Sequence, residues 1–282
     1  MLAKRVPSIL PDMSFDEMIE TTKIHSIAGT LKHDGLITTR PFRSPHHTVT
    51  PVGLGGGGTG TIRPGEVSLA NNGVLFLDEL PEFSRTALEV LRQPIETALS
   101  QFQEQVRNAL SVFDYGGCRN EPCPCGYYGD PTRKCTCSEQ KIKRYLNRIS
   151  GPLLDRFDIH VEVPAVKFEE LRDASSAECS ADIKKRADRA REIQRERFKG
   201  SKTTCNAKIN AEQFEKVCII DKEAEKTLKD AFESLGLTAR AYDRVLKVAR
   251  TIADLDESEI IRSEHVLEAV QYRSLDRKYW AK

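Results

Sequence analysis

The segment 73–79 is the most constraining feature of this chain, because a short apolar run leads directly into two adjacent carboxylates. An uninterrupted apolar run such as 74–77 predicts a strand that is buried on both faces of a sheet. In open α/β sheets, ligands bind at the carboxyl ends of the strands. Asp78 and Glu79 follow the predicted strand directly, so we expect them to lie at a ligand-binding edge.

This order of residues has the form of a Walker B motif. In that motif Asp78 would hold Mg²⁺, directly or through a water molecule, and Glu79 would orient the water that attacks a γ-phosphate. The plainer alternative is a core strand followed by a solvated turn. The sequence contains no G-x-x-x-x-G-K-[ST] loop to cradle the phosphates, and its glycine-rich stretch 53–60 has no lysine after it.

Composition gives no general argument for a nucleic-acid or a membrane partner. The 282 residues carry a formal net charge of +1, so overall charge does not steer the protein to a polyanion. No apolar run reaches the length of a membrane span, and the N-terminus lacks the apolar region of a signal peptide. We therefore expect a cytoplasmic protein whose eight cysteines are reduced thiols or metal ligands rather than disulfides.

Capping residues and helical periodicity predict the helices of the first part of the chain. Ser14 and Glu17 form a capping-box pattern that opens a helix through about Ile27. Ser84 is expected to cap another helix, which Pro94 should kink or end.

The pattern changes near residue 165. Before it, the apolar alternation of 159–163 predicts a strand; after it, no strand pattern remains and the sequence predicts a small helical bundle. Helices are expected at 181–199, 222–234 and 238–254 and in two segments capped by Asn210 and Ser263. The strongly charged helix at 181–199 is either a solvated helix or a nucleic-acid surface.

With these segments placed, the chain resembles the magnesium-chelatase-like branch of the AAA+ ATPases, of the YifB/ComM type. The segments that carry the resemblance are 40–48, 63–70, 73–83, 91–96, 122–126, 149–158, 239–244 and 249–255. The resemblance implies an α/β fold with an incomplete AAA+ P-loop core, a parallel sheet with flanking helices, in residues 1–165. A small all-helical lid domain would follow in residues 166–282.

The resemblance also implies an ATP and Mg²⁺ site with two arginines besides Asp78 and Glu79. Arg156 matches the arginine finger, which reaches a neighbouring subunit's γ-phosphate and accelerates hydrolysis by about 10³–10⁵. Arg240 matches the sensor-2 position of the lid, which contacts the nucleotide phosphates. The alternatives are a structural Arg156 that pairs with Asp155 or Asp158, and a solvated Arg240.

Two segments depart from the family pattern. In the family, the phosphate-binding loop ends in Gly-Lys-Thr just before a segment like 1–5, so we expect the chain to begin just after its P-loop, as a fragment. A sensor-1 strand should end in Asn, but Glu121 stands there. The preceding stretch 99–120 is also unlike the family, and 100–108 within it predicts a polar helix or loop. About residues 98–121 are therefore either a true divergence or out of frame, since shifted frames can restore an apolar strand ending in Asn.

Four cysteines form a C-x-C-x₉-C-x-C cluster, namely Cys123, Cys125, Cys135 and Cys137. Two close pairs of thiolates can complete a tetrahedral Zn²⁺ site, and the glycines and proline between the pairs supply the turns that bring them together. The alternative is a set of plain reduced thiols. The sequence thus predicts a structural zinc site.

Three functions compete. The first is an ATPase module of a homo-oligomeric ring, hexameric by family resemblance, that moves single-stranded or branched DNA and is linked to competence. The second is a metal-chelatase accessory ATPase. The third is a catalytically inactive fragment with a structural zinc loop. His46 and His47, in a basic loop, either contact DNA or serve in packing and capping.

Overall fold

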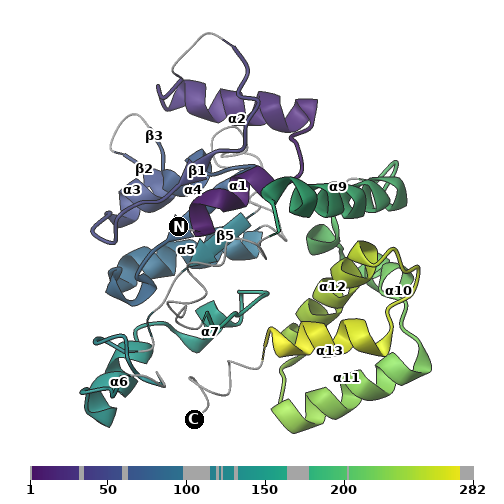
Figure 1. Cartoon of the computed structure of the whole chain (residues 1–282). Helices are drawn as coiled ribbons and strands as arrows, with labels where there is room; N and C mark the ends of the chain where they lie inside the picture. The colour runs from purple at the N-terminus through teal and green to yellow at the C-terminus, as the bar shows by residue number, and fades with distance from the viewer. Residues whose placement is uncertain are drawn as a thin grey trace. The chain divides into compact units, whose positions relative to one another are not determined.

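The computed structural model describes residues 2–31, 35–58, 63–97, 115–118, 121, 123–129, 133–163, 178–201 and 203–273. Contacts between residues divide the chain into two compact units (Figure 1). The first unit comprises 1–7 and 12–153, and the second comprises 8–11 and 154–282. Each unit is described by itself. The predicted boundary at residue 165 lies outside the described residues.

The first unit is built on a parallel sheet with the strand order β1-β4-β5. Strand β1 is Phe42–Arg43, β4 is Val74–Leu77 and β5 is Tyr115–Cys118. Phe42 pairs with Val74, and Val74 in turn pairs with Tyr115. The central strand β4 is buried, as its apolar sequence predicted, with Val74, Leu75 and Leu77 no more than 5% exposed.

A glycine sets the start of β4. The amide of Val74 donates to the carbonyl of Pro41 at 2.8 Å. A Cβ atom at Gly73 would lie 2.1 Å from that carbonyl oxygen, so only glycine allows the two segments to approach this closely. Arg40 adds a hydrogen bond from Nη1 to the carbonyl of Asn72 at 2.7 Å.

Short helices and a hairpin surround this sheet in the first unit (Figure 1). They are η1 Leu2–Arg5, α2 Phe15–Ile27, α3 Pro51–Gly55, α4 Glu66–Leu69, η2 Leu80–Glu82, α5 Arg85–Thr97 and α6 Glu139–Leu146. Two further short helices, α1 Val6–Ile9 and α7 Gly151–Leu154, contain residues of both units. The antiparallel hairpin joins β2 Gly56–Gly57 to β3 Arg63–Pro64. The capping box of Ser14 and Glu17 at the start of α2 is present as predicted. None of the described helices is long and apolar enough to span a bilayer.

Helix α5 departs from the prediction at its end. Ser84 caps it as expected, because its Oγ accepts from the amide of Ala87 at 3.2 Å. Pro94 was expected to kink or end the helix; α5 continues to Thr97, so Pro94 does not end it. The helix is held on its other turns by packing, since Leu88 and Leu91 are no more than 4% exposed. The loss of one backbone hydrogen bond at proline is offset by this burial.

The stretch 99–120 differs from the family pattern, and within it Tyr115–Cys118 forms strand β5. The segment 100–108, which was predicted to be a polar helix or loop, lies outside the described residues. Four residue pairs, from Val74 with Tyr115 to Leu77 with Cys118, join β5 to β4 in parallel. Backbone pairing with a buried neighbour, rather than alternation in the sequence, makes this segment a strand. Residues 98–114, 119 and 120 of the segment interpreted as divergent or out of frame lie outside the described residues.

The second unit is helical in its described residues, as predicted. Its elements are α9 Ser180–Arg197, η4 Asn206–Lys208, α10 Ala211–Val217, α11 Lys222–Leu235, α12 Ala239–Leu255 and α13 Ser263–Gln271. Its core gathers apolar residues from Phe198, at the end of α9, to α13, among them Leu228, Val245 and Val266. Asn210 caps α10 through the predicted capping box with Gln213. Ser263 was predicted to cap α13, but Arg262 is the N-cap, because the Ser263 hydroxyl bonds Thr227 Oγ1 at 2.9 Å.

The strand predicted at 159–163 is absent from the structure. Its three apolar side chains, Ile159, Val161 and Val163, are between 52% and 70% exposed. The amide of His160 instead donates to the carbonyl of Tyr272 at 2.8 Å. Alternation favours a strand only where a neighbouring strand can pair with it, and the described residues offer none to this segment.

A buried ionic cluster joins the helices of the second unit. The carboxylate of Asp254 on α12 is fully buried and accepts hydrogen bonds from Asn206 at 2.7 Å and from Arg197 at 2.8 Å. Arg250, one turn earlier on α12, donates to the same carboxylate at 3.1 Å. Gln194 on α9 contributes a longer bond at 3.3 Å. Paired on all sides, these buried charges hold α9, η4 and α12 together.

Candidate active site and metal centre

Asp78 and Glu79 lie at the carboxyl end of β4, where the sequence placed them. Both are exposed, and the amide of Glu79 donates to Asp78 Oδ1 at 3.2 Å. Glu79 has a φ of 55°, in the left-handed region that costs a residue with a Cβ about 1–3 kcal/mol. Leu80, only 1% exposed, anchors the turn into η2. The sharp turn thus presents two carboxylates to solvent from a buried strand.

His47 approaches Glu79 from the neighbouring strand's end. Its Nδ1 lies 3.4 Å from Glu79 Oε2. Its ring packs against His46, with 4.0 Å between the ring centroids, and meets Phe83 edge-on at 6.4 Å. Because β1 and β4 are parallel, the loop after Arg43 emerges at the same edge of the sheet as the two acids.

The contact of His47 with Glu79 was not predicted. The sequence offered packing, capping or DNA contact for the histidine pair, and the structure shows packing in the ring contacts of His46 and His47 and a local bond of His46 Nδ1 with Thr48 Oγ1 at 3.0 Å. The missing signal was β1, because a strand of two residues has no periodicity to detect. Once β1 is known to pair with β4, the position of His47 follows.

Glu121 lies near the same edge, at the position where the family pattern has Asn. The buried phenol of Tyr145 on α6 has its pKa raised by burial and then by the charges of Glu82, Glu121 and Glu79. A carboxylate oxygen of Glu121 also lies 3.4 Å from where a Cβ atom of Gly126 would stand. Glu121 therefore lies beside the cysteine loop.

Arg156 belongs to the second unit and is half-buried. Its carbonyl accepts a hydrogen bond from Arg244 Nη1 at 2.7 Å. The sequence left open a structural pairing of Arg156 with Asp155 or Asp158. In the structure, Asp158 forms its ion pair with Arg244, and Asp155 lies 3.8 Å from Arg273. The two acids thus serve to fix the segment around Arg156.

Arg240 is exposed at the second residue of α12. Thr238 caps this helix by accepting from the amide of Ala241 at 3.2 Å. The N-terminus of a helix favours anions, because its first amides lack partners within the helix. Arg240 and Arg244 stand one turn apart. Asp78 and Glu79 belong to the first unit, so the two arginines and the two acids are described separately.

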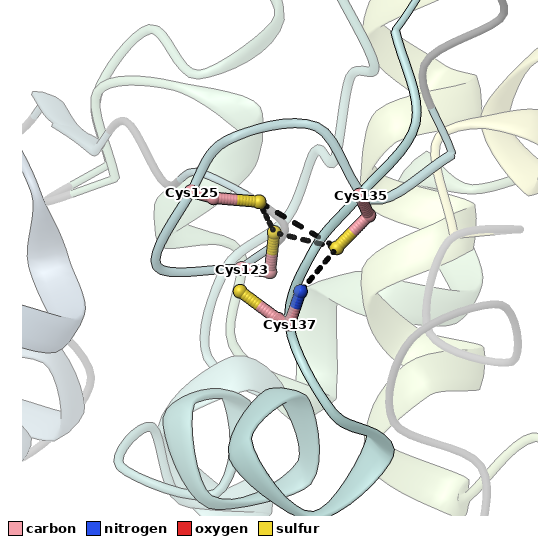
Figure 2. Close-up of side chains that lie close together, drawn as sticks. All are labelled: Cys123, Cys125, Cys135 and Cys137. Carbon is pink, nitrogen blue, oxygen red and sulfur yellow. Dashed lines mark hydrogen bonds between the residues drawn. The ribbon is translucent and has the colours of Figure 1, made fainter.

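The four cysteines of the predicted metal site come together in the first unit (Figure 2). Their sulfur atoms all lie within 4.8 Å of one another. Cys123 Sγ is 3.3 Å from Cys125 Sγ and 3.7 Å from Cys135 Sγ, and Cys125 and Cys135 are 3.5 Å apart. Four sulfurs at about 2.3 Å from a tetrahedral Zn²⁺ would be about 3.8 Å apart. The donor set and its spacing therefore fit zinc.

The cysteine loop connects the end of β5 to the start of α6. Gly126 and Gly129 have φ values of 80° and 84°, which turn the chain back between the two cysteine pairs. Ser138, directly after Cys137, caps α6. Hydrogen bonds from the backbone of Tyr127 and Thr136 lower the pKa of Cys125 to about 5. The thiolate is the form of cysteine that binds metal.

Comparison with known proteins identifies the family. Residues 1–171 match the family model described as magnesium chelatase, subunit ChlI, and residues 177–273 match the model for the C-terminal part of that subunit. The chain belongs to the magnesium chelatase ChlI family. In this family's AAA+ architecture, the parallel sheet of the first unit belongs to the ATPase-like core and the helical second unit to the C-terminal domain.

Curated members of the ChlI family align with almost the whole chain. The YifB proteins of Salmonella typhimurium and Escherichia coli are each 42% identical over 98% of it. The competence protein ComM of Haemophilus influenzae is 41% identical over 98%. The aligned region makes up 54% of each YifB protein and 53% of ComM, so the chain spans about half the length of these relatives.

Proposed function

We propose that this chain is part of an ATP-hydrolysing AAA+ module. In it, Asp78 and Glu79 would act on a magnesium–triphosphate complex, Asp78 by holding the ion and Glu79 by orienting the attacking water. The observation that carries the proposal is the exposed acidic pair at the carboxyl end of the buried central strand β4. Carboxylate oxygens are suitable ligands for Mg²⁺, which binds proteins through one or two carboxylates and keeps several waters. The exposure of both acids leaves room for those waters.

The two acids take different parts in the reaction. Bound Mg²⁺ would neutralise charge on the β- and γ-phosphates. Asp78 would hold the ion, directly or through water. Glu79 would accept a hydrogen bond from the attacking water and orient it toward the γ-phosphate. His47, 3.4 Å from the Glu79 carboxylate, would limit the directions in which that carboxylate can point.

Arg156 would act on the nucleotide of a neighbouring copy. A guanidinium that reaches a γ-phosphate stabilises the charge of the transition state. The structure supports such a role by the way it fixes the segment, since Arg244 binds the carbonyl of Arg156 and the carboxylate of Asp158. This arrangement requires a homo-oligomer, which we propose to be a hexameric ring. Arg240, exposed at the start of α12, would contact the phosphates from the lid.

The module would drive movement of single-stranded or branched DNA. The name of the Haemophilus influenzae relative, competence protein ComM, supports this choice. The family name supports the second candidate, a metal-chelatase accessory ATPase. Four clustered thiols fit a reducing compartment, so we place the module in the cytoplasm.

We propose that Cys123, Cys125, Cys135 and Cys137 hold a structural Zn²⁺. The support is the close approach of the four sulfurs and the lowered pKa of Cys125. Four protein ligands would close the coordination shell, so the ion would stabilise the loop between β5 and α6 rather than activate water.

The zinc proposal is tested by metal analysis of the 282-residue chain. The wild-type chain should bind about one zinc per molecule, as a four-cysteine site implies. A double variant, Cys123→Ser with Cys135→Ser, should bind none. The matched control, Cys179→Ser with Cys205→Ser, removes two thiols outside the cluster and should keep the ion. Equal zinc in both double variants would reject the site.

The ATPase proposal is tested in a fusion that places a phosphate-binding loop segment from a family relative before Met1. The fusion should hydrolyse ATP, and Glu79→Gln should lower kcat by about 10²–10⁴ while ATP binding is kept. Glu79→Gln should leave the stability of the fold unchanged, because the Glu79 side chain is 57% exposed. A fusion that binds ATP and hydrolyses it equally well with Gln at position 79 would overturn the assignment.

The chain without the added loop gives the complementary measurement. Because its sequence contains no G-x-x-x-x-G-K-[ST] motif, we expect Mg²⁺-dependent ATP binding too weak to matter at cellular ATP concentrations. Isothermal titration of ATP in the presence of Mg²⁺ measures this directly. Tight binding by the chain alone would show that other residues cradle the phosphates.

A further inference from the structure

The first unit contains an open cleft that none of the roles above uses. Its volume is about 970 Å³. One wall is the segment from η2 to the first turns of α5, and the other is α6 with the turn that follows it. The lining residues are Pro81, Glu82, Phe83, Arg85, Leu88, Glu89, Gln140, Lys143, Arg144, Asn147, Arg148, Ser150 and Leu153.

The wall formed by α6 is a stripe of hydrogen-bond donors. Gln140 and Asn147 each lie three or four residues from both Lys143 and Arg144, so the four residues share one face. The opposite face of the helix is buried and apolar, with Ile142, Tyr145 and Leu146 each 6% exposed. The packing of that face fixes the direction in which the donors point.

Positive charge exceeds negative charge in the cleft. Arg85, Lys143, Arg144 and Arg148 stand against Glu82 and Glu89, which leaves two positive charges in excess. Arg148 Nη1 is 3.1 Å from the Glu82 carboxylate, so this pair largely cancels itself. Within the described part of the chain, Arg85, Lys143 and Arg144 form no ion pair. Three cations therefore remain available to an anionic ligand.

The two aromatic residues next to the cleft are not available for stacking. Phe83 is 4% exposed and Tyr145 is 6% exposed. Proteins that hold single strands through their bases expose aromatic faces to them, whereas cations and amide donors hold the phosphates. This cleft therefore offers cations and amide donors for phosphates, but no exposed aromatic face on which a base could stack.

We propose that this cleft binds the phosphodiester backbone of a nucleic-acid single strand without reading its bases. Lys143 and Arg144 on one wall and Arg85 on the other would contact successive phosphates, and Gln140 and Asn147 would donate hydrogen bonds beside them. The choice of a nucleic acid over another polyanion rests on the proposed function. The site itself is independent of ATP, so it can be tested without nucleotide.

The test is fluorescence anisotropy of the 282-residue chain with labelled oligo-dT of about 20 nucleotides, longer than the site of a common single-strand-binding fold. The variant is Lys143→Gln with Arg144→Gln. The control is Lys222→Gln with Lys226→Gln, which removes the same charge from two exposed positions of α11. Replacing surface cations by glutamine should leave both variants folded, which circular dichroism checks.

The cleft variant should bind oligo-dT on the order of tenfold more weakly at about 0.1 M salt, and the slope of log K against log salt should fall by about 1.4, two contacts at 0.7 each. The control should change neither, and oligo-dA should bind as oligo-dT does. Equal losses in both variants, or none in either, would overturn the proposal. Displacement of the oligonucleotide by poly-glutamate at equal charge would also overturn the proposal, because it would indicate that the ligand of the cleft is an acidic protein segment. None of these results depends on the outcome of the Glu79→Gln experiment.

Discussion

The carboxylates after β4 and the carboxylate of Asp254 on α12 have the same chemistry in opposite surroundings. Asp254 is fully buried and is bound by Arg197, Arg250, Asn206 and Gln194. A charge removed from water must be paired, and this one uses its oxygens entirely within the protein. The Asp254 carboxylate oxygens are therefore not available to a ligand.

Asp78 and Glu79 are exposed, and the contacts that hold them are few: the Glu79 amide to Asp78 and His47 to Glu79. Their turn carries backbone strain at Glu79 rather than a network of donors. Oxygens that the protein leaves uncommitted remain available to a metal ion and a water molecule. The comparison teaches that the number of internal partners separates a structural acid from a candidate catalytic one.

The largest expected effect extends the comparison to Arg156. In the fusion with a phosphate-binding loop, Arg156→Ala should lower kcat by about 10³–10⁵, because the charge that stabilises the transition state is removed. ATP binding, measured by equilibrium dialysis, should remain within a few-fold of wild type. If kcat stays within tenfold of wild type, Arg156 is a structural residue, as Asp254 is.

Mixing provides the control for the Arg156 variant. An Arg156→Ala subunit keeps Glu79, and a Glu79→Gln subunit keeps Arg156. If the arginine acts on a neighbour's nucleotide, a mixture of the two inactive variants should recover part of the lost hydrolysis. No recovery on mixing, with mixed oligomers shown to form, would place the arginine in its own subunit's site.

The next effect is on stability. Asp254→Ala should lower the free energy of unfolding by about 3–5 kcal/mol, because it leaves buried arginine charge without its partner. Asp78→Ala should change it by no more than about 0.5 kcal/mol, as expected for an exposed residue. Urea denaturation followed by circular dichroism measures both. Similar losses in the two variants would remove the distinction between the two regions.

The smallest effect concerns His47. His47→Ala should lower kcat in the fusion by about tenfold, the lower end for a residue that orients a reacting group through one contact. The KM for ATP and the unfolding midpoint should stay unchanged, which separates positioning from a loss of structure. His46→Ala, which removes the adjacent ring but not the contact with Glu79, serves as the control. An equal loss in both variants would assign the effect to the loop as a whole.

Local signals in the sequence predicted the features that depend on neighbouring residues. The strand before Asp78, the capping boxes at Ser14 and Asn210, and the pairing of the cysteines all lie within short spans of the chain. The prediction of β4 succeeded because a buried strand is apolar along its whole length.

Features that depend on distant partners were not predictable in this way. Strands β1 and β5 exist because they pair with β4, and neither is long enough to show a period. The contact of His47 with Glu79 depends on that pairing, and the cleft depends on how α6 packs against the segment after η2. Conversely, residues 159–163 have a strand's alternation, but no described strand pairs with them.

The bond between Arg244 and the carbonyl of Arg156 has a mechanical consequence. Arg240 and Arg244 are carried by one continuous helix, and a helix transmits displacement along its length with little bending. A tilt of α12 that moved the side chain of Arg240 toward a phosphate would also move Arg244, and with it the backbone at Arg156. If Arg240 and Arg156 have the proposed roles, α12 would thus couple a subunit's contact with its own nucleotide to its contact with the nucleotide of the next subunit.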